Sequence, residues 1–321
     1  MTIKEALNLP KNLDPEVLLA FALKKDQSFL FANPDKNLPP ILYSKFLILV
    51  RRRSRGWPVA YLTGHKEFFG LDFRVSPNVL IPRPETELLV ELALGLLSPS
   101  PNPSPQGRGN KKNNSSPLRG EARRGWNVID LGTGSGNIIT SLAVILERSD
   151  RIPDLKFFAT DTSTAALKVA KANARRHGVA KKIKFIQGNL LAPLTLNNSM
   201  ESFPTLIIAN LPYLTKSQLH EPSIRHEPKS ALFGGKDGLK YYRELFKQLT
   251  PTQPPPSRGR KKEKIPLPLW EGLGEGFTLL LEHDPRQKPK LKGLVKLYLA
   301  EAKVKFHKDL SGRFRVAELN F

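Results

Sequence analysis

From residue 126 onward, short apolar runs alternate with segments in which apolar residues recur at helical spacing. Each run is nearly continuous in apolar residues, which is typical of strands that are buried on both faces of a parallel sheet. We therefore expect an α/β domain whose mostly parallel sheet is covered by helices on both faces. The five predicted strands are 128–131, 156–160, 183–186, 206–209 and 277–281.

The end of the chain departs from this alternation. Residues 304–307 and 314–319 are two further strand-like runs, and Ser311 and Gly312 lie in the turn between them. Two such runs, separated only by a short turn, favour an antiparallel hairpin. The expected sheet is therefore parallel over most of its width and ends in a C-terminal antiparallel hairpin.

The chain before this sheet divides into two parts. Residues 1–64 carry apolar residues at helical spacing with almost no strand pattern, which predicts a small α-helical domain. Residues 65–84 contain two short aromatic runs around a glycine, which predict a β-hairpin. We therefore divide the chain into a helical domain at 1–64, a hairpin linker at 65–84 and an α/β domain at 85–321.

Proline is concentrated in two stretches of the α/β domain, near 98–125 and 250–276. Both stretches lack the periodic apolar residues that a packed element needs, and they resemble each other in sequence. We interpret them as two copies of one inserted low-complexity element and expect surface loops. The alternative is a pair of nucleic-acid-binding arms, because both stretches carry an excess of positive charge.

The composition excludes several kinds of site. The chain has no cysteine, so a disulfide, a thiolate metal site and a cysteine nucleophile are excluded, and an intracellular chain is favoured. The six histidines show no metal-ligand spacing, so we expect no metal. We also expect neither a membrane span nor a signal peptide, because the sequence lacks apolar runs of the required kind. The formal net charge of +22 predicts a basic surface that attracts nucleic acid, ribosomes or acidic proteins.

Three alternating glycines follow the first predicted strand of the sheet and lead into a helix. Glycine at such a place lets the backbone turn tightly and approach a ligand closely. The spacing is G-x-G-x-G, whereas dinucleotide-binding loops have G-x-G-x-x-G. Asp130 precedes the loop and could hydrogen-bond an ammonium group; Asp161, after the next strand, could accept from two ribose hydroxyls or cap a helix. The loop consists of Gly132, Thr133, Gly134, Ser135 and Gly136.

This loop, together with Asp161, resembles the S-adenosylmethionine loop of Rossmann-like methyltransferases. The resemblance implies that S-adenosylmethionine is the cofactor and that Asp130, the loop and Asp161 bind it. It also places Asn189, after the third strand, near the adenine edge. Leu190 stands where some relatives have an aromatic residue against the adenine, and Asn210 is a further candidate contact.

The segment Asn210-Leu211-Pro212-Tyr213 follows the fourth predicted strand. Ligands bind at the carboxyl ends of the strands in an open parallel sheet, although such residues can also simply end a strand. Methyl transfer to a planar NH2 group requires the nitrogen lone pair to be aimed at the methyl carbon. Asn210 Oδ1 and the Leu211 carbonyl could accept the two N–H bonds, and Tyr213 could lie against the flat acceptor. The catalytic candidates are therefore Asn210, Pro212 and Tyr213, and all four residues are candidates for substrate binding.

The combined motifs resemble the HemK/PrmC-type methyltransferases, which modify the glutamine amide in the Gly-Gly-Gln motif of peptide chain release factors. Segments 81–91 and 227–239 resemble further signatures of that family, and weaker agreement continues at 281–283 and 309–316. The acceptor motif departs from the family's Asn-Pro-Pro-Tyr at Leu211. Because that position acts through its backbone carbonyl, leucine can keep the contact.

The resemblance implies a Rossmann-like methyltransferase in the cytoplasm, with release factors as protein substrates that the helical domain at 1–64 recognises. A ribosomal RNA adenine-N6 methyltransferase is the alternative, because Asn-Leu-Pro-Tyr also occurs in such enzymes and the chain is basic. Those enzymes place their helical part after the cofactor domain, whereas this chain has it before. A non-enzymatic ribosome-binding protein would leave the glycine loop and the acceptor motif unexplained. Nucleic acid is therefore not the expected substrate.

Overall fold

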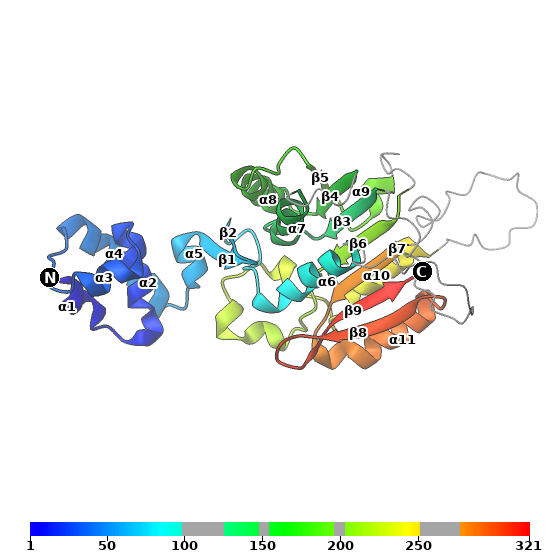
Figure 1. Ribbon diagram of the computed structural model, residues 1–321. Coiled ribbons are helices and arrows are strands. Elements are labelled where there is room, and N and C mark those ends of the chain that lie inside the picture. Colours follow the sequence, from blue (N-terminus) through cyan, green and yellow to red (C-terminus); the bar gives the residue numbers. More distant parts are fainter. Residues whose placement is uncertain (98–124, 148–153, 196–202, 251–276) are drawn as a thin grey trace, which may run out of the picture.

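The central feature of the computed structural model is a sheet with strand order β5-β4-β3-β6-β7-β9-β8 (Figure 1). The structure describes residues 1–97, 125–147, 154–195, 203–250 and 277–321. Neighbouring strands pair in parallel from β5 to β7, whereas β9 pairs antiparallel with both β7 and β8. The sheet strands are β3 (Trp126–Leu131), β4 (Leu155–Asp161), β5 (Ile183–Gln187), β6 (Thr205–Ala209), β7 (Phe277–Glu282), β8 (Lys303–Lys308) and β9 (Phe314–Asn320).

This architecture confirms the predicted fold class. Each observed strand contains the run predicted for it, because the strands that occupy the middle of the sheet are buried on both faces and therefore apolar almost throughout. The two proline-rich stretches lie almost entirely outside the described residues, which omit 98–124 and 251–276 and include only Gly125 and Thr250 at their edges. The surface loops expected there stay a prediction. No helix within the described ranges is long and apolar enough to cross a membrane.

Two hydrophobic cores lie on opposite faces of the sheet. One contains Tyr242 and Phe246 of α10 together with Leu291 of α11, and the other contains Leu89 of α6 and Leu142 of α7. The helices that follow the hairpin are α6 (Glu87–Leu97), α7 (Asn137–Glu147), α8 (Thr164–Arg176), α9 (Ala192–Thr195), α10 (Lys240–Leu249) and α11 (Lys288–Tyr298).

The strand order reverses at β3. The chain runs from β3 outward to β4 and β5, and then returns to place β6 on the other side of β3. The loops that leave β3 and β6 therefore diverge at the carboxyl edge of the sheet, where open α/β sheets bind their ligands. This reversal brings the glycine loop and the acceptor motif to one place.

Helices of the N-terminal region form a separate small core beside the sheet domain (Figure 1). Phe46 of α4 and Leu18 of α2 are fully buried in that core. Thr2 and Glu5 form a capping box that starts the first helix. The helices are α1 (Ile3–Leu7), α2 (Pro15–Leu23), α3 (Gln27–Ala32), α4 (Pro40–Ser54) and α5 (Val59–Thr63).

A hairpin connects these helices to the sheet domain. Its strands, β1 (His65–Phe68) and β2 (Leu71–Arg74), are joined at Phe69 and Gly70, both with positive φ. Asn173 of α8 binds the backbone of Arg74 at both its N–H and its carbonyl, at 2.8 and 3.0 Å. The hairpin is therefore fixed against the helix that follows β4.

Candidate functional site

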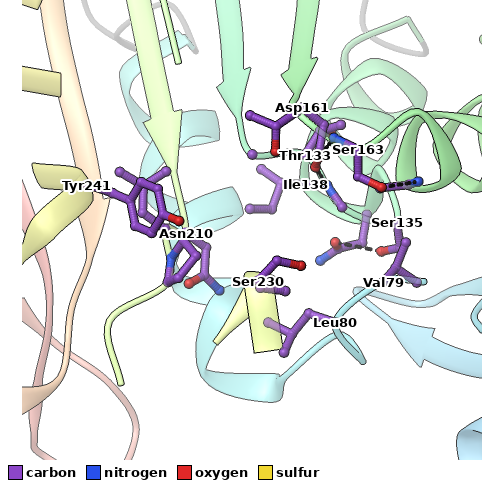
Figure 2. Close-up of a pocket in the computed structure, with 18 of the residues that line it drawn as sticks. Val79, Leu80, Thr133, Ser135, Ile138, Asp161, Ser163, Asn210, Ser230 and Tyr241 are labelled. Atoms are coloured by element: carbon purple, nitrogen blue, oxygen red, sulfur yellow. Dashed lines mark hydrogen bonds between the residues drawn. The ribbon is translucent and has the colours of Figure 1, made fainter. Parts of the chain in front are cut away.

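A pocket opens at the carboxyl edge of the sheet, where the loops after β3, β4, β5 and β6 meet (Figure 2). We call it the main pocket. It is lined by all the predicted site residues except Asp130, Gly136 and Tyr213. A second cavity, the adjoining cavity, shares Asn210 and Leu211 with the main pocket and is also lined by Tyr213. The predicted members of the main pocket are Gly132, Thr133, Gly134, Ser135, Asp161, Asn189, Leu190, Asn210, Leu211 and Pro212.

The glycine loop is held in shape by contacts to β4 and α8. Thr133 N donates to the Thr160 carbonyl at 2.9 Å, and Gly134 N donates to Asp161 Oδ2 at 2.9 Å. Gly136 has a φ of +76° and approaches α8 so closely that an added Cβ would stand 3.0 Å from the Cβ of Ala170. Only glycine meets both demands at position 136, because other residues are strained at positive φ.

Asp130 lies behind the loop and not on the pocket wall. Its Oδ2 accepts a hydrogen bond from the Thr133 hydroxyl at 2.7 Å, whereas its Oδ1 has no hydrogen-bond partner among the described residues. Burial raises the pKa of Asp130 to about 7, even though the Thr133 hydroxyl lowers it. A buried carboxyl with one open oxygen is suited to a cationic ligand group, which would restore the interactions lost with water.

Asp161 lies on the pocket wall at the end of β4 and accepts two backbone N–H groups. Its Oδ1 binds Ser163 N at 2.8 Å, and its Oδ2 binds the glycine loop. Ser163, not Asp161, caps α8, because its hydroxyl accepts from Ala166 N. Burial raises the pKa of Asp161 above its usual value, although both backbone N–H groups lower it.

Asn189 and Leu190 extend the wall on the β5 side. Leu190 is buried and adopts a positive φ of 55°, and its carbonyl accepts from the Thr160 hydroxyl at 3.0 Å. Gln248 of α10 accepts from Leu191 N at 2.9 Å, which ties the same turn to the helix that shares its core. The side chain of Asn189 is exposed, so it is available to a ligand in the pocket.

The acceptor motif is held at both ends by side chains from distant parts of the chain. Asn210 Nδ2 donates to the Thr86 hydroxyl at 3.0 Å, and the Tyr213 hydroxyl donates to Glu282 Oε1 at 3.1 Å. Gln287 Nε2 also donates to the Tyr213 carbonyl at 2.8 Å. The Tyr213 hydroxyl therefore points to the end of β7, and the residue reaches the adjoining cavity but not the main pocket.

Two residues of the site could not be named from motifs, namely Thr86 and Tyr241, which line the main pocket. Arg83, which the sequence offered together with Glu85 as a residue that shapes the cleft, lines both cavities. Arg83 forms an ion pair with the buried Glu227, which also accepts from Ile81 N at 3.1 Å. The sequence drew attention to segments 81–91 and 227–239 as a whole, and this ion pair joins them. Within the described residues, no three His, Asp or Glu side chains are grouped so that they could hold a metal ion.

Known proteins resemble the chain over most of its length. Residues 6–64 match a family described as the PrmC N-terminal domain, and residues 122–253 match one described as a methyltransferase domain. The release factor glutamine methyltransferase of Moorella thermoacetica is 38% identical over 236 residues, which are 73% of this chain and 71% of that protein. That of Dictyoglomus turgidum is 31% identical over 309 residues, or 96% and 90% of the two chains.

One similar solved structure is the protein-(glutamine-N5) methyltransferase (release factor-specific) of Alicyclobacillus acidocaldarius. It is 23% identical, with a TM-score of 0.37, over 77% of this chain and 98% of that one.

Proposed function

The chain belongs to the release factor glutamine methyltransferase family, and from that premise we propose how its two cavities carry out the reaction. The enzyme transfers a methyl group to the side-chain amide nitrogen of a glutamine in peptide chain release factors, and we assign the glutamine to their Gly-Gly-Gln motif. The observation that most supports methyl transfer to an amide is that the glycine loop and Asn210 line the same pocket. Because the substrate is a translation factor, we place the reaction in the cytoplasm.

The enzyme depends on S-adenosylmethionine, as methyltransferases with such a domain do, and we assign its site to the main pocket. When bound, this cofactor supplies a methyl carbon that carries a sulfonium as its leaving group. We assign the cofactor's ammonium group to Asp130, which lies behind the glycine loop and whose buried Oδ1 has no hydrogen-bond partner among the described residues. Asp161 keeps lone pairs for ribose hydroxyls beyond its two backbone bonds, and we assign Asn189, which lines the same pocket, to the adenine.

Asn210 and Leu211 orient the substrate amide in this proposal. Asn210 Nδ2 is bound to Thr86, so its Oδ1 is left to accept one N–H of the glutamine side chain. The Leu211 carbonyl accepts the other N–H, and together the two acceptors fix the nitrogen with its lone pair toward the methyl carbon. The developing positive charge on nitrogen is stabilised by these two oxygens.

No strong base is required for the transfer itself. The nitrogen attacks as a neutral amide and loses its proton after methylation, to water or to a backbone carbonyl. Among the described residues that line the main pocket, Asp161 is the only carboxylate, and we assign it to the cofactor. The contribution of the protein is therefore orientation and electrostatic stabilisation more than proton transfer.

We assign recognition of the release factor to the helical domain at 1–64. Trp57 stacks on His226 with ring centroids 4.5 Å apart, and His226 Nε2 contacts the Arg55 carbonyl at 3.3 Å. The loop that carries His226 also supplies Ile224 to the adjoining cavity. A protein bound on the N-terminal helices could therefore extend along this loop to Asn210.

An apolar surface on α4 provides a place for such a partner. Ile41 and Ile48 are 83% and 58% exposed, and the same helix ends in Arg51, Arg52 and Arg53. Exposed large apolar side chains beside positive charge are typical of protein interaction surfaces.

We expect the double substitution Ile41→Asp and Ile48→Asp to raise the KM for release factor about tenfold, the effect of losing about 1.4 kcal/mol of binding. Both side chains are exposed, so folding, kcat and cofactor affinity remain unchanged. Leu310→Asp, at a fully exposed position in the turn between β8 and β9, is the matched control and leaves KM unchanged. An equal KM in the double variant and the wild type would contradict the assignment of this surface.

The activity is tested by incubating the protein with labelled S-adenosylmethionine and either release factor or ribosomal RNA. We expect label in the release factor. Label in the RNA and none in the protein would instead support an adenine methyltransferase.

A further inference from the structure

A buried threonine lies behind the acceptor asparagine. Thr86 ends the short 3-10 helix η2 (Pro84–Thr86), which precedes α6, and it is 2% exposed. Its hydroxyl accepts the hydrogen bond from Asn210 Nδ2, although the two residues are 124 positions apart in the sequence. A hydroxyl has one proton to donate and can accept at the same time, so the Thr86 proton remains for another acceptor.

Glu282 is placed to be that acceptor. It ends β7, the strand beside β6, and is 1% exposed. Its Oε1 accepts from the Tyr213 hydroxyl, whereas its Oε2 is buried with no hydrogen-bond partner among the described residues. Leu281 pairs with Ala209 across β7 and β6, so Glu282 and Asn210 both directly follow a paired position at the ends of these strands. The Thr86 hydroxyl, which binds Asn210, also lowers the pKa of Glu282. An unpaired carboxylate oxygen in a protein interior is costly, and one donor beside it removes much of that cost.

We propose that Glu282, Thr86 and Asn210 form a positioning chain that fixes which end of the Asn210 amide faces the substrate. The Glu282 carboxylate accepts a hydrogen bond from the Thr86 hydroxyl. That hydroxyl has no second proton, so toward Asn210 it can only accept. Nδ2 must then face Thr86, and Oδ1 faces the substrate amide. This inference rests on the proposed function, because it concerns the orientation of the same acceptor site.

The orientation matters because an asparagine amide has two ends of similar shape and opposite hydrogen-bonding character. If the amide were rotated by half a turn, an NH2 group would meet the NH2 group of the glutamine. Two donors would then face each other, and the acceptor that holds the substrate nitrogen would be lost. The positioning chain therefore acts on the rate of transfer, because it fixes the reactive geometry and does not contribute to docking of the release factor.

The charge state of Glu282 agrees with this role. Burial raises its pKa to about 6, against the lowering effects of the Thr86 hydroxyl and Arg315. Its ionised form can accept from both Tyr213 and Thr86, and each of these hydroxyls lowers the pKa. One side chain thus supports both ends of the four-residue acceptor motif.

The test replaces Thr86 by valine, which keeps the branched shape and removes the hydroxyl. We expect kcat for release factor methylation to fall about ten- to a hundredfold, with KM for release factor and Kd for S-adenosylmethionine within about twofold of the wild type. Thr86→Ser retains the hydroxyl and restores most of the rate. Glu282→Gln, which removes the ionised acceptor, lowers kcat in the same direction.

Thr278→Val is the matched control. Thr278 is 3% exposed and lies near the other end of β7, where its hydroxyl donates to Asn320 Oδ1 at 2.9 Å. This substitution removes one buried hydroxyl and one hydrogen bond, as Thr86→Val does, and we expect kcat to be unchanged.

Three results would overturn the proposed chain while leaving the proposed function intact. They are a wild-type kcat in Thr86→Val, a loss confined to KM, and an equal loss in Thr86→Val and Thr86→Ser. The last result would show that packing and not the hydroxyl is responsible. Absence of release factor methylation by the wild-type protein would overturn the proposed function and, with it, the chain.

Discussion

Replacement of Asn210 by alanine is expected to reduce kcat for release factor methylation at least about a hundredfold, because the substrate amide loses the side-chain acceptor that orients it. The main pocket keeps its glycine loop and Asp161, so the Kd for S-adenosylmethionine stays within a few-fold of the wild type. Single-turnover kinetics at saturating cofactor and a separate titration of cofactor binding measure the two quantities.

The same variant offers an internal control for folding. The Asn210 side chain is only half-buried, so its removal opens no enclosed cavity. We therefore expect little change in the unfolding temperature. Unchanged single-turnover rates in a folded Asn210→Ala protein would refute the role assigned to this residue.

Replacement of Asp130 by asparagine is expected to stabilise the cofactor-free protein and at the same time weaken cofactor binding. Burial holds the pKa of Asp130 at about 7, well above the value of about 4 that an unfolded chain has. At pH 8 this difference in pKa lowers the free energy of unfolding by about 4 kcal/mol, a loss that the neutral asparagine avoids. The variant loses the negative charge toward the cofactor's ammonium group, and its Kd rises at least about tenfold.

The pH dependence fixes the sign of this prediction. Because the folded protein holds the Asp130 proton more tightly than the unfolded chain, this residue makes the wild type lose stability as pH rises from about 4 to about 7. The advantage of Asp130→Asn is therefore largest at pH 8 and shrinks steadily on acidification. Denaturant unfolding of both proteins across this range measures it, and an advantage that does not change with pH would contradict the buried-carboxyl account.

Asp309→Asn is a control for which we expect the opposite change in stability at pH 8. Burial raises the pKa of Asp309, but hydrogen bonds from Ser311, the Arg313 backbone and Arg315 outweigh it, and the pKa lies below its usual value. The charged form is the favoured one here, so we expect its replacement to destabilise the protein at pH 8.

The sheet could be predicted from the sequence because strands covered on both faces are apolar almost throughout. The runs at 128–131 and 206–209 lie entirely within β3 and β6, and the turn at Gly312 marked the final hairpin. The insertion of β9 between β7 and β8 could not be predicted, because strand order depends on tertiary pairing that leaves no local pattern.

The candidate site divides in the same way. The glycine loop and Asn210 could be found because each is a local pattern directly after a buried strand. Thr86 and Glu282 lie in the segments 81–91 and 281–283 that the sequence marked, but neither could be named individually. A threonine before a helix and a glutamate at the end of a strand are ordinary residues until the fold brings them to the acceptor motif. Leu211 stands where the family has proline. Its side chain is buried, and the role proposed for this position belongs to the backbone carbonyl, which both residues have.

The account is tested most directly by locating the transferred methyl group. Release factor is incubated with the protein and S-adenosylmethionine, and the peptide that contains the Gly-Gly-Gln motif is fragmented in a mass spectrometer. The account predicts the mass of one added methyl group on the side-chain amide of that glutamine, and none in a release factor in which alanine replaces it. A methyl group on another residue, or transfer that persists in the alanine variant, would contradict it.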